Sequence, residues 1–283
     1  MLKVMVVGVG HWGKNLAQCF RELGNLEVLA DINPATLDKA HDVTITQDYR
    51  QCLRLIDAVA ISTPMGSHYE IARDCLEAGK HVLVEKPMCT SARECRELIG
   101  LAEKQGLVLM VGHTYLYNQA VRAMLQAAGD DCPMLLCHWQ NLDPPRTFSD
   151  AVWNILPHPI SIALHFAAAI KKIDIWHRLE KSLMVRLEWD KGHAFISADW
   201  GKLPKERHVT ISNNKGNLFF TETSEKRVLS ISNSSLSFLN DNPLKEECQH
   251  FIECIEKGVK PLTDGYQGLK VVEVLEKIER LLT

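Results

Sequence analysis

The sequence predicts an α/β domain with a parallel sheet, followed by an α+β domain built on antiparallel strands. Two observations carry this fold class. Strand-like and helix-like patterns alternate over the first ~120 residues, as a parallel sheet with covering helices requires. From Pro133 onward, strand-like runs follow one another with almost no helices between them. We place the division at residue 118, so the predicted domains span 1–118 and 119–283.

In the first domain, each expected strand is a short apolar run and each expected helix has apolar residues at helical spacing. The expected strands cover residues 4–7, 26–30, 58–62, 81–85 and 107–112. The expected helices follow Gly13, start at Pro34 and at His68, and cover 91–105, with Gly79 and Gly106 placed to end two of them.

In the second domain, strand-like runs are separated by turn sequences such as Asp190-Lys191-Gly192. One helical stretch, 155–170, is expected early, and two more, 244–257 and 266–282, at the end. The expected strands form an antiparallel meander of residues 134–140, 183–189, 193–200, 208–212, 217–221 and 227–232.

The most informative motif is Gly8, Gly10 and Gly13 in G-x-G-x-x-G spacing, directly after an expected strand and directly before an expected helix. Gly8 permits a tight turn, Gly10 lets the backbone approach a pyrophosphate, and Gly13 lets the helix pack on the strand. Asp31 ends the next apolar run, about 20 residues on, where a carboxylate binds the ribose hydroxyls. The motif therefore predicts a dinucleotide site.

The nature of Asp31 favours NAD over NADP. A carboxylate repels a 2′-phosphate, and no Arg or Lys follows until Lys39. An ordinary turn aspartate before Asn33-Pro34 is the plainer alternative.

Composition narrows the classes of partner. The net charge of −3 gives no reason to expect nucleic acid or an anionic membrane. No apolar stretch reaches the ~18 residues that span a bilayer, and the first residues lack the pattern of a signal peptide. The nine cysteines form no C-x-x-C pair, and no His/Cys cluster has metal-ligand spacing. We expect a reduced, cytoplasmic protein without a metal site.

Several motifs together resemble the glucose–fructose oxidoreductase / inositol dehydrogenase (Gfo/Idh/MocA) family nearly end to end. Besides the glycine motif, they are Ser62-Thr63-Pro64 with His68, the stretch 79–87 ending in Glu85-Lys86-Pro87, Val111-Gly112-His113-Thr114, the stretch 153–158, and the tail 261–265. The resemblance implies a Rossmann domain followed by an α+β domain with a large, mostly antiparallel open sheet. The variants at 10–16 and 111–114 look most like members that act on nucleotide-activated sugars.

The resemblance implies that Lys86 and His158 are the catalytic residues. Lys86 follows a strand where parallel sheets expose their ligand crevice, and its ammonium can polarise a carbonyl. His158 matches the acid/base histidine, although a core histidine is the alternative. Two departures bear on activity, because Asn154 and Pro159 stand where the family often has aspartates.

The remaining candidate site residues divide by ligand. The expected cofactor-binding residues are Gly8, Gly10, His11, Trp12, Gly13, Asp31, Thr63, Pro64, His68, Glu85 and Lys86. The expected substrate contacts are His113, Tyr117, Asn118, Arg146 and Asn154. For Arg146, a solvated loop arginine is an equal alternative.

The resemblance thus implies an NAD(P)-dependent oxidoreductase that transfers a hydride between the cofactor and a sugar or polyol hydroxyl, with a nucleotide sugar as one substrate class. The alternative is a non-catalytic protein that senses a dinucleotide or sugar and binds a protein partner. We also expect a homodimer or homotetramer formed through the open sheet, whose strands carry apolar residues on both sides.

Overall fold

A computed structural model describes the chain except for residues 1, 38–41, 142–146, 202–203, 232–233 and 238–241. The chain forms two compact units. The first contains Met1–His113 and Leu244–Val272, and the second contains Thr114–Pro243 and Glu273–Thr283.

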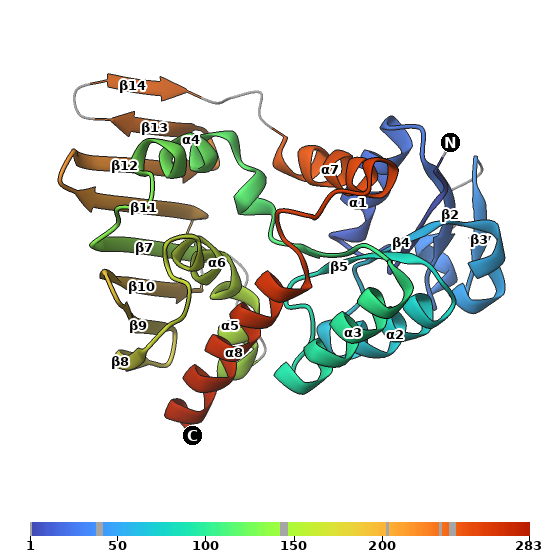
Figure 1. Cartoon of the computed structure of the whole chain (residues 1–283), viewed down its shortest axis with the longest axis horizontal. Coiled ribbons are helices and arrows are strands. Elements are labelled where there is room, and N and C mark those ends of the chain that lie inside the picture. The colour runs from blue at the N-terminus through green and yellow to red at the C-terminus, as the bar shows by residue number, and fades with distance from the viewer. Residues whose placement is uncertain (1, 38–41, 142–146, 202–203, 232–233, 238–241) are drawn as a thin grey trace. The chain divides into compact units, whose positions relative to one another are not determined.

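The first unit is built on a six-stranded sheet in which every pair of neighbouring strands is parallel. The strand order is β3-β2-β1-β4-β5-β6. Figure 1 shows helices α1 and α7 on one side of this sheet and α2 and α3 on the other. The strands are β1 (Val4–Val7), β2 (Leu26–Ala30), β3 (Thr44–Thr46), β4 (Ala58–Ile61), β5 (His81–Glu85) and β6 (Leu109–Gly112). The helices are α1 (Gly13–Glu22), α2 (His68–Glu77), α3 (Ala92–Gln105) and α7 (Pro243–Lys257), with short 3-10 helices at Pro34–Thr36, Tyr49–Leu55 and Met65–Ser67.

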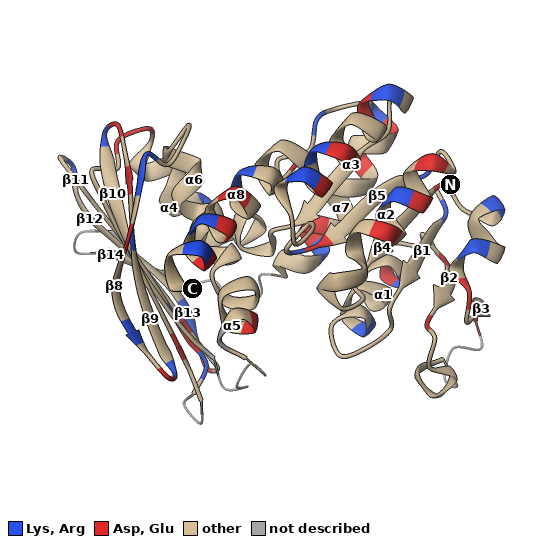
Figure 2. Cartoon of the chain, turned by 90° about the horizontal axis from the view of Figure 1, so that it is seen from below, with Lys and Arg blue, Asp and Glu red and all other residues tan. Residues whose placement is uncertain are grey.

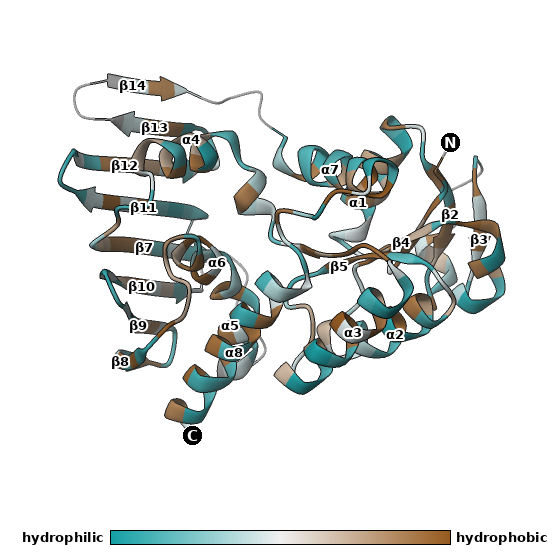
Figure 3. Ribbon diagram, viewed as in Figure 1, coloured by the Kyte–Doolittle hydropathy of each residue, from teal (hydrophilic) through white to brown (hydrophobic). Residues whose placement is uncertain are grey.

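The apolar runs form the strands because both faces of the sheet are covered. Every residue of β1 and β4 is buried, as a parallel sheet between two layers of helices requires. Figure 3 shows these central strands as predominantly hydrophobic, whereas teal residues mark the outer sides of the helices. Local signals fix the helix ends: the Ser91 hydroxyl accepts from the Arg93 N–H at 3.2 Å, and Gly106 ends α3 with φ 66°.

The C-terminal part of the chain returns to the first unit, and this corrects the predicted division. The prediction assigned everything from residue 119 onward to one domain, but Leu244–Val272 pack with the first 113 residues. Helix α7 is tied to α1 by an ion pair of 2.8 Å between Lys245 and Glu22. The Val111 N–H donates to the Thr263 carbonyl at 2.8 Å, beside β6. The division falls inside α8 (Gly265–Leu282).

The second unit is built on an eight-stranded sheet of order β14-β13-β12-β11-β7-β10-β9-β8. Figures 1 and 2 show α4 and α6 on one face of this sheet, and no helix among this unit's described residues lies on the other face. The strands are β7 (Met134–Asn141), β8 (Lys172–Leu179), β9 (Ser182–Trp189), β10 (Gly192–Trp200), β11 (Glu206–Asn213), β12 (Gly216–Thr223), β13 (Arg227–Ile231) and β14 (Ser234–Ser237). The helices are a 3-10 turn at Thr114–Tyr117, α4 (Gln119–Ala128), α5 (Phe148–Ile155), α6 (Pro157–Phe166) and the end of α8.

Alternating burial along the strands separates the two faces of this sheet. In β9 the buried residues are Leu183, Val185, Leu187 and Trp189, as their spacing predicts. The opposite face is open and carries exposed apolar side chains, among them Leu136, Trp176 and Phe219. The predicted large, mostly antiparallel open sheet is confirmed.

The structure differs from the expected elements in several places. The meander is interrupted, because β7 lies between β10 and β11 and runs parallel to β10. The predicted helical stretch 155–170 is the shorter helix α6, which begins at Pro157 and ends at Phe166. Strands β3, β8 and β14 and helices α4 and α5 were not predicted.

Three further observations concern the cysteines, membrane-spanning helices and metal sites. All nine cysteines are free thiols and buried. No helix in the described part of the chain is both long and apolar enough to cross a membrane. Among the same residues, no group of three or more His, Cys, Asp or Glu side chains is arranged to hold a metal ion.

Candidate functional site

The glycine-rich loop joins β1 to α1 at the carboxyl end of the sheet. Gly8 has φ +86°, and a Cβ there would lie 2.8 Å from the Thr63 nitrogen. A Cβ on Gly13 would lie 1.8 Å from the Gly8 carbonyl oxygen, so α1 starts in direct contact with the loop. A Cβ on Gly10 would meet nothing within 4 Å. The first and third glycines are therefore required by packing, and the second faces open space in which a pyrophosphate fits.

The Asp31 carboxylate lies beside this loop, one residue after the end of β2. Its Oδ2 accepts from the Val9 N–H at 2.7 Å, and its Oδ1 accepts from the Asn33 N–H at 2.8 Å. Both bonds hold the carboxylate at the place where the ribose hydroxyls of a dinucleotide bind in this fold. Ile32, next to it, is 87% exposed.

Lys86 follows β5 directly, and Glu85 before it is buried. The Glu85 carboxylate accepts from the Trp12 indole N–H and from the Lys86 N–H. Burial raises the pKa of Glu85, although the charge of Lys86 and the bond from Trp12 oppose it. A Cβ on Gly112 would lie 3.0 Å from the same carboxyl group. Glu85 thus links the glycine loop to Lys86. His11, which precedes Trp12 in that loop, is exposed.

His68 was predicted to bind the cofactor, but its ring lies between two backbone carbonyl groups. Its Nε2 lies 2.8 Å from the Thr63 carbonyl oxygen and its Nδ1 lies 2.9 Å from the Pro87 carbonyl oxygen. The side chain is buried, and burial lowers the pKa of His68 against the effect of the two carbonyls. His68 therefore ties the segment Thr63–Pro64 after β4 to the segment after β5, and both ring nitrogens are used in doing so.

His113 follows β6 and is 1% exposed. Neither of its ring nitrogens has a hydrogen-bond partner among the residues that the structure describes. Burial, with the charge of Lys86, lowers the pKa of His113 to about 3, so the imidazole is neutral near pH 7. A buried polar group without a partner costs about 1–3 kcal/mol, which favours a ligand that completes its hydrogen bonds.

The second unit holds the other predicted residues. His158 lies in the first turn of α6, between Pro157 and Pro159, and its carbonyl accepts from the Ser161 hydroxyl at 2.7 Å. Asn154 is exposed and lies on α5, so the helix break separates it from His158.

Two of the remaining substrate candidates are buried, and one cannot be placed. Tyr117 is 2% exposed and Asn118 is 1% exposed. The Asn118 Oδ1 accepts from the Val121 N–H at 3.1 Å and caps α4, so its side chain has a structural role. Arg146 lies outside the described residues.

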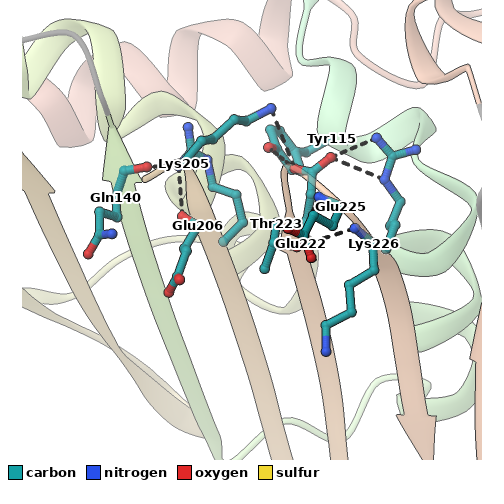
Figure 4. A network of polar contacts seen from close by, with 10 residues as sticks. Tyr115, Gln140, Lys205, Glu206, Glu222, Thr223, Glu225 and Lys226 are labelled. Carbon is teal, nitrogen blue, oxygen red and sulfur yellow. Dashed lines mark hydrogen bonds and ion pairs between the residues drawn. The ribbon is translucent and has the colours of Figure 1, made fainter. Parts of the chain in front are cut away.

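A charged network on the helix-covered face of the second sheet was not predicted. The Tyr115 hydroxyl donates to the Glu222 carboxylate at 2.5 Å, and the Tyr115 ring packs edge-to-face on the His158 ring with centroids 5.0 Å apart. Figure 4 shows Tyr115 and Lys205 reaching toward Glu222. Alternation along β12 could have found Glu222, since it shares the buried side of that strand with Leu218 and Phe220.

Known protein sequences resemble this chain most clearly over the first unit. Residues 2–113 match the profile of Gfo/Idh/MocA, an oxidoreductase family with an NAD-binding Rossmann fold. The chain is 30% identical over 177 residues to UDP-N-acetylglucosamine 3-dehydrogenase of Acidithiobacillus ferrooxidans, covering 59% of this chain and 55% of that protein. It is 25% identical over 190 residues to 4-carboxy-2-hydroxymuconate-6-semialdehyde dehydrogenase of a Sphingobium species, with 60% of each chain covered. The chain thus spans less than two thirds of these curated relatives.

Solved structures share the fold over nearly the whole chain. UDP-N-acetylglucosamine 3-dehydrogenase from Acidithiobacillus ferrooxidans superposes with a TM-score of 0.88 at 20% identity, covering 99% of this chain and 97% of that one. Scyllo-inositol dehydrogenase from Lactobacillus casei, with bound NAD(H) and scyllo-inositol, gives a TM-score of 0.84 at 18% identity, covering 99% and 96%. Residues 2–113 are thus similar to the NAD-binding Rossmann domain of the Gfo/Idh/MocA oxidoreductases, and the whole chain shares the fold of these solved structures.

Proposed function

We propose that this protein is an NAD-dependent oxidoreductase that acts on a hydroxyl-bearing carbon of a sugar or polyol. The observation that carries the proposal is the carboxyl edge of the first sheet. There, Gly10 faces open space, Asp31 lies 2.7 Å from the Val9 nitrogen, and Lys86 follows β5. When bound, the nicotinamide supplies the hydride chemistry, and the protein binds and orients the reactants.

We propose NAD as the preferred cofactor. Both oxygens of Asp31 are fixed by backbone N–H groups, so the carboxylate stays in place to accept from the ribose hydroxyls. A 2′-phosphate at the same position would meet a fixed negative charge.

Lys86 and His158 are the proposed catalytic residues. The Lys86 ammonium donates hydrogen bonds to the substrate oxygen and stabilises the charge that develops there. His158 takes the hydroxyl proton during oxidation and returns it during reduction. His113, neutral and without a hydrogen-bond partner among the described residues, contributes a donor and an acceptor for the substrate or the carboxamide of the cofactor.

The substrate class that we propose is a nucleotide-activated sugar. The support is the relative named UDP-N-acetylglucosamine 3-dehydrogenase, which shares 30% identity over 177 residues with this chain. Arg146 remains a candidate contact for the diphosphate, because a guanidinium binds such groups through two hydrogen bonds.

We also propose a homodimer or homotetramer that buries the open face of the second sheet. Phe195, Leu136, Thr210 and Phe219 are neighbours across four strands of that face. Trp176 lies edge-to-face on Phe195 at 4.6 Å and is 59% exposed. Three of these four residues are apolar, and apolar side chains gathered on an open face are typical of an interface.

Light scattering at micromolar concentration tests the assembly. Leu136→Asp should lower the measured mass, because it places a charge in the middle of the row. Val259→Asp is the matched control, since Val259 is also exposed but lies in the first unit. A wild-type protein with the mass of a monomer would contradict the proposal.

The buried cysteines support a proposal for the cellular compartment of the protein, and its net charge supports one for its partners. Nine buried free cysteines suit a reducing compartment, and we propose the cytoplasm. The net charge of −3 gives neither nucleic acid nor an anionic membrane a reason to bind.

The test of the activity is a screen of UDP-sugars and inositols with NAD, followed as NADH absorbance. We expect at least one substrate to give turnover, which Lys86→Ala abolishes. Lys104→Ala, an exposed lysine on α3, is the control and should retain the rate. A protein that binds NAD but turns over no substrate would instead support the sensing alternative, which Asn154 and Pro159 motivate.

A further inference from the structure

A row of charged side chains crosses the helix-covered face of the second sheet. Trp139 on β7 pairs with Arg207 on β11, Arg207 pairs with Glu222 on β12, and Glu222 pairs with Arg227 on β13. Arg207 and Glu222 are 6% and 5% exposed. Burying charges on the core side of a sheet is costly unless they are paired, so this row calls for an explanation beyond stability.

Glu222 is the centre of the row. Its Oε1 accepts from Arg227 Nη2 at 2.6 Å and Nε at 3.1 Å, and its Oε2 accepts from the Tyr115 hydroxyl at 2.5 Å. Burial by itself would raise the pKa of Glu222, but Lys205, 3.9 Å away, and these hydrogen bonds keep it below its ordinary value. The carboxylate is therefore charged near pH 7 and forms a charge-assisted bond with the phenol.

The Tyr115 ring links the row to His158. It lies edge-to-face with the Trp139 ring at 5.2 Å and with the His158 ring at 5.0 Å and 61°. Burial, together with the charge of Glu222, raises the pKa of Tyr115, so the phenol stays protonated and remains a donor. The tyrosine is thus anchored at its hydroxyl by the sheet and contacts the imidazole with its ring.

We infer that Tyr115 is a positioning residue that sets the plane of the His158 imidazole, and that Glu222 and Arg227 hold it in place. The inference rests on the proposed function of His158 as the acid/base residue. The χ2 torsion of a histidine is broad, so a ring contact is needed to fix the direction of the reactive nitrogen. A displacement of about 1 Å at a reacting group can cost about 10²-fold in rate.

Two variants remove the anchor while keeping the aromatic ring: Tyr115→Phe and Glu222→Gln. We expect each to lower kcat about tenfold, with KM and NAD affinity unchanged and with a larger solvent deuterium isotope effect on kcat. Glu225→Gln is the matched control, because Glu225 lies in the adjacent turn and is exposed. The control should behave as wild type.

A double-mutant cycle separates positioning from a general loss of structure. If Tyr115 acts through His158, Tyr115→Phe should leave the residual rate of His158→Ala unchanged. Equal fold-losses in both backgrounds would overturn the inference, and so would a wild-type kcat for Tyr115→Phe and Glu222→Gln.

An NMR measurement tests the contact between Tyr115 and His158 without turnover. The test can therefore be made even if the protein turns over none of the substrates. The Hε1 resonance of His158 is identified among the twelve histidines by its loss in His158→Gln. We expect the ring-current shift of this resonance to change in Tyr115→Phe and in Glu222→Gln, but not in Glu225→Gln. An unchanged resonance in both anchor variants would overturn the inference. Absence of turnover in wild-type protein would overturn only the proposed function.

Discussion

The substitution Gly13→Ala should break the contact on which the dinucleotide loop is built. A Cβ at residue 13 would lie 1.8 Å from the Gly8 carbonyl oxygen and 2.5 Å from Ser62 Oγ. Ordinary contact begins at 3.4 Å, so the carbonyl would have to move by about 1.6 Å. That carbonyl accepts from the Ser62 hydroxyl at 2.7 Å, and the Gly8 N–H donates to Ala30 at 2.8 Å. The loop therefore cannot yield without losing these bonds.

We expect Gly13→Ala to destabilise the first unit by about 3 kcal/mol, the upper end of the usual cost of overpacking. The measurement is urea unfolding followed by far-UV circular dichroism, with NADH titrated in parallel. Unfolding at the wild-type urea concentration would refute the reasoning.

Gly10→Ala is the matched control for this variant, since both add one methyl group to the same loop. A Cβ at residue 10 meets nothing within 4 Å, and Gly10 is not among the glycines with positive φ. Stability should be unchanged, but the methyl group would occupy the space proposed for the pyrophosphate. We expect NADH affinity to fall at least about tenfold, or ~1.4 kcal/mol. Unchanged affinity would place the dinucleotide elsewhere.

Three more predictions follow from the first unit. Asp31→Ala should weaken NADH binding and narrow the gap to NADPH in a fluorescence titration, whereas tighter NADPH binding by the wild type would contradict the assignment. Lys86→Ala should abolish turnover and leave the Kd for NADH within about threefold, as measured by calorimetry. The pKa of Asp74, which burial would raise, is lowered by hydrogen bonds from Tyr49 and Arg50, both of 2.8 Å. The stabilisation of the folded state by the charged Asp74 is fully present above the unfolded pKa of about 4. It is lost as the pH falls through the lower pKa that Asp74 has in the folded state. Asp74→Asn should therefore destabilise by about 1 kcal/mol at pH 7 and not at pH 2 in urea unfolding, and an equal loss at both values would refute this.

The first domain could be predicted because its signals are local. Apolar runs, capping residues and the glycine spacing each act within a few residues, and the predicted strands and helices appear with nearly the same bounds. Strand β3 was missed because its three residues, Thr44–Thr46, are too short to show a pattern. The return of residues 263–268 to β6 is a long-range contact, which no local pattern reveals.

In the candidate site, the hydrogen-bond partners could not be predicted. His68 and Asn118 have the right residue types and positions for ligand contacts, but backbone groups bond both ring nitrogens of His68 and the Oδ1 of Asn118. Glu222 and Arg207 were not predicted as site residues because charged residues are not expected on the buried side of a strand. Their pairing depends on the register of β11 and β12, which only the structure defines.

We propose that this protein moves a hydride between a sugar carbon and the nicotinamide. The most direct measurement uses UDP-N-acetylglucosamine, and then the other UDP-sugars and inositols, deuterated at the ring carbons, with NAD. Mass spectrometry of the recovered cofactor follows the label. We expect one deuterium per turnover to reach the nicotinamide ring with at least one substrate, and none to do so with Lys86→Ala. Unlabelled cofactor with every substrate, from a protein that binds NAD, would contradict the account.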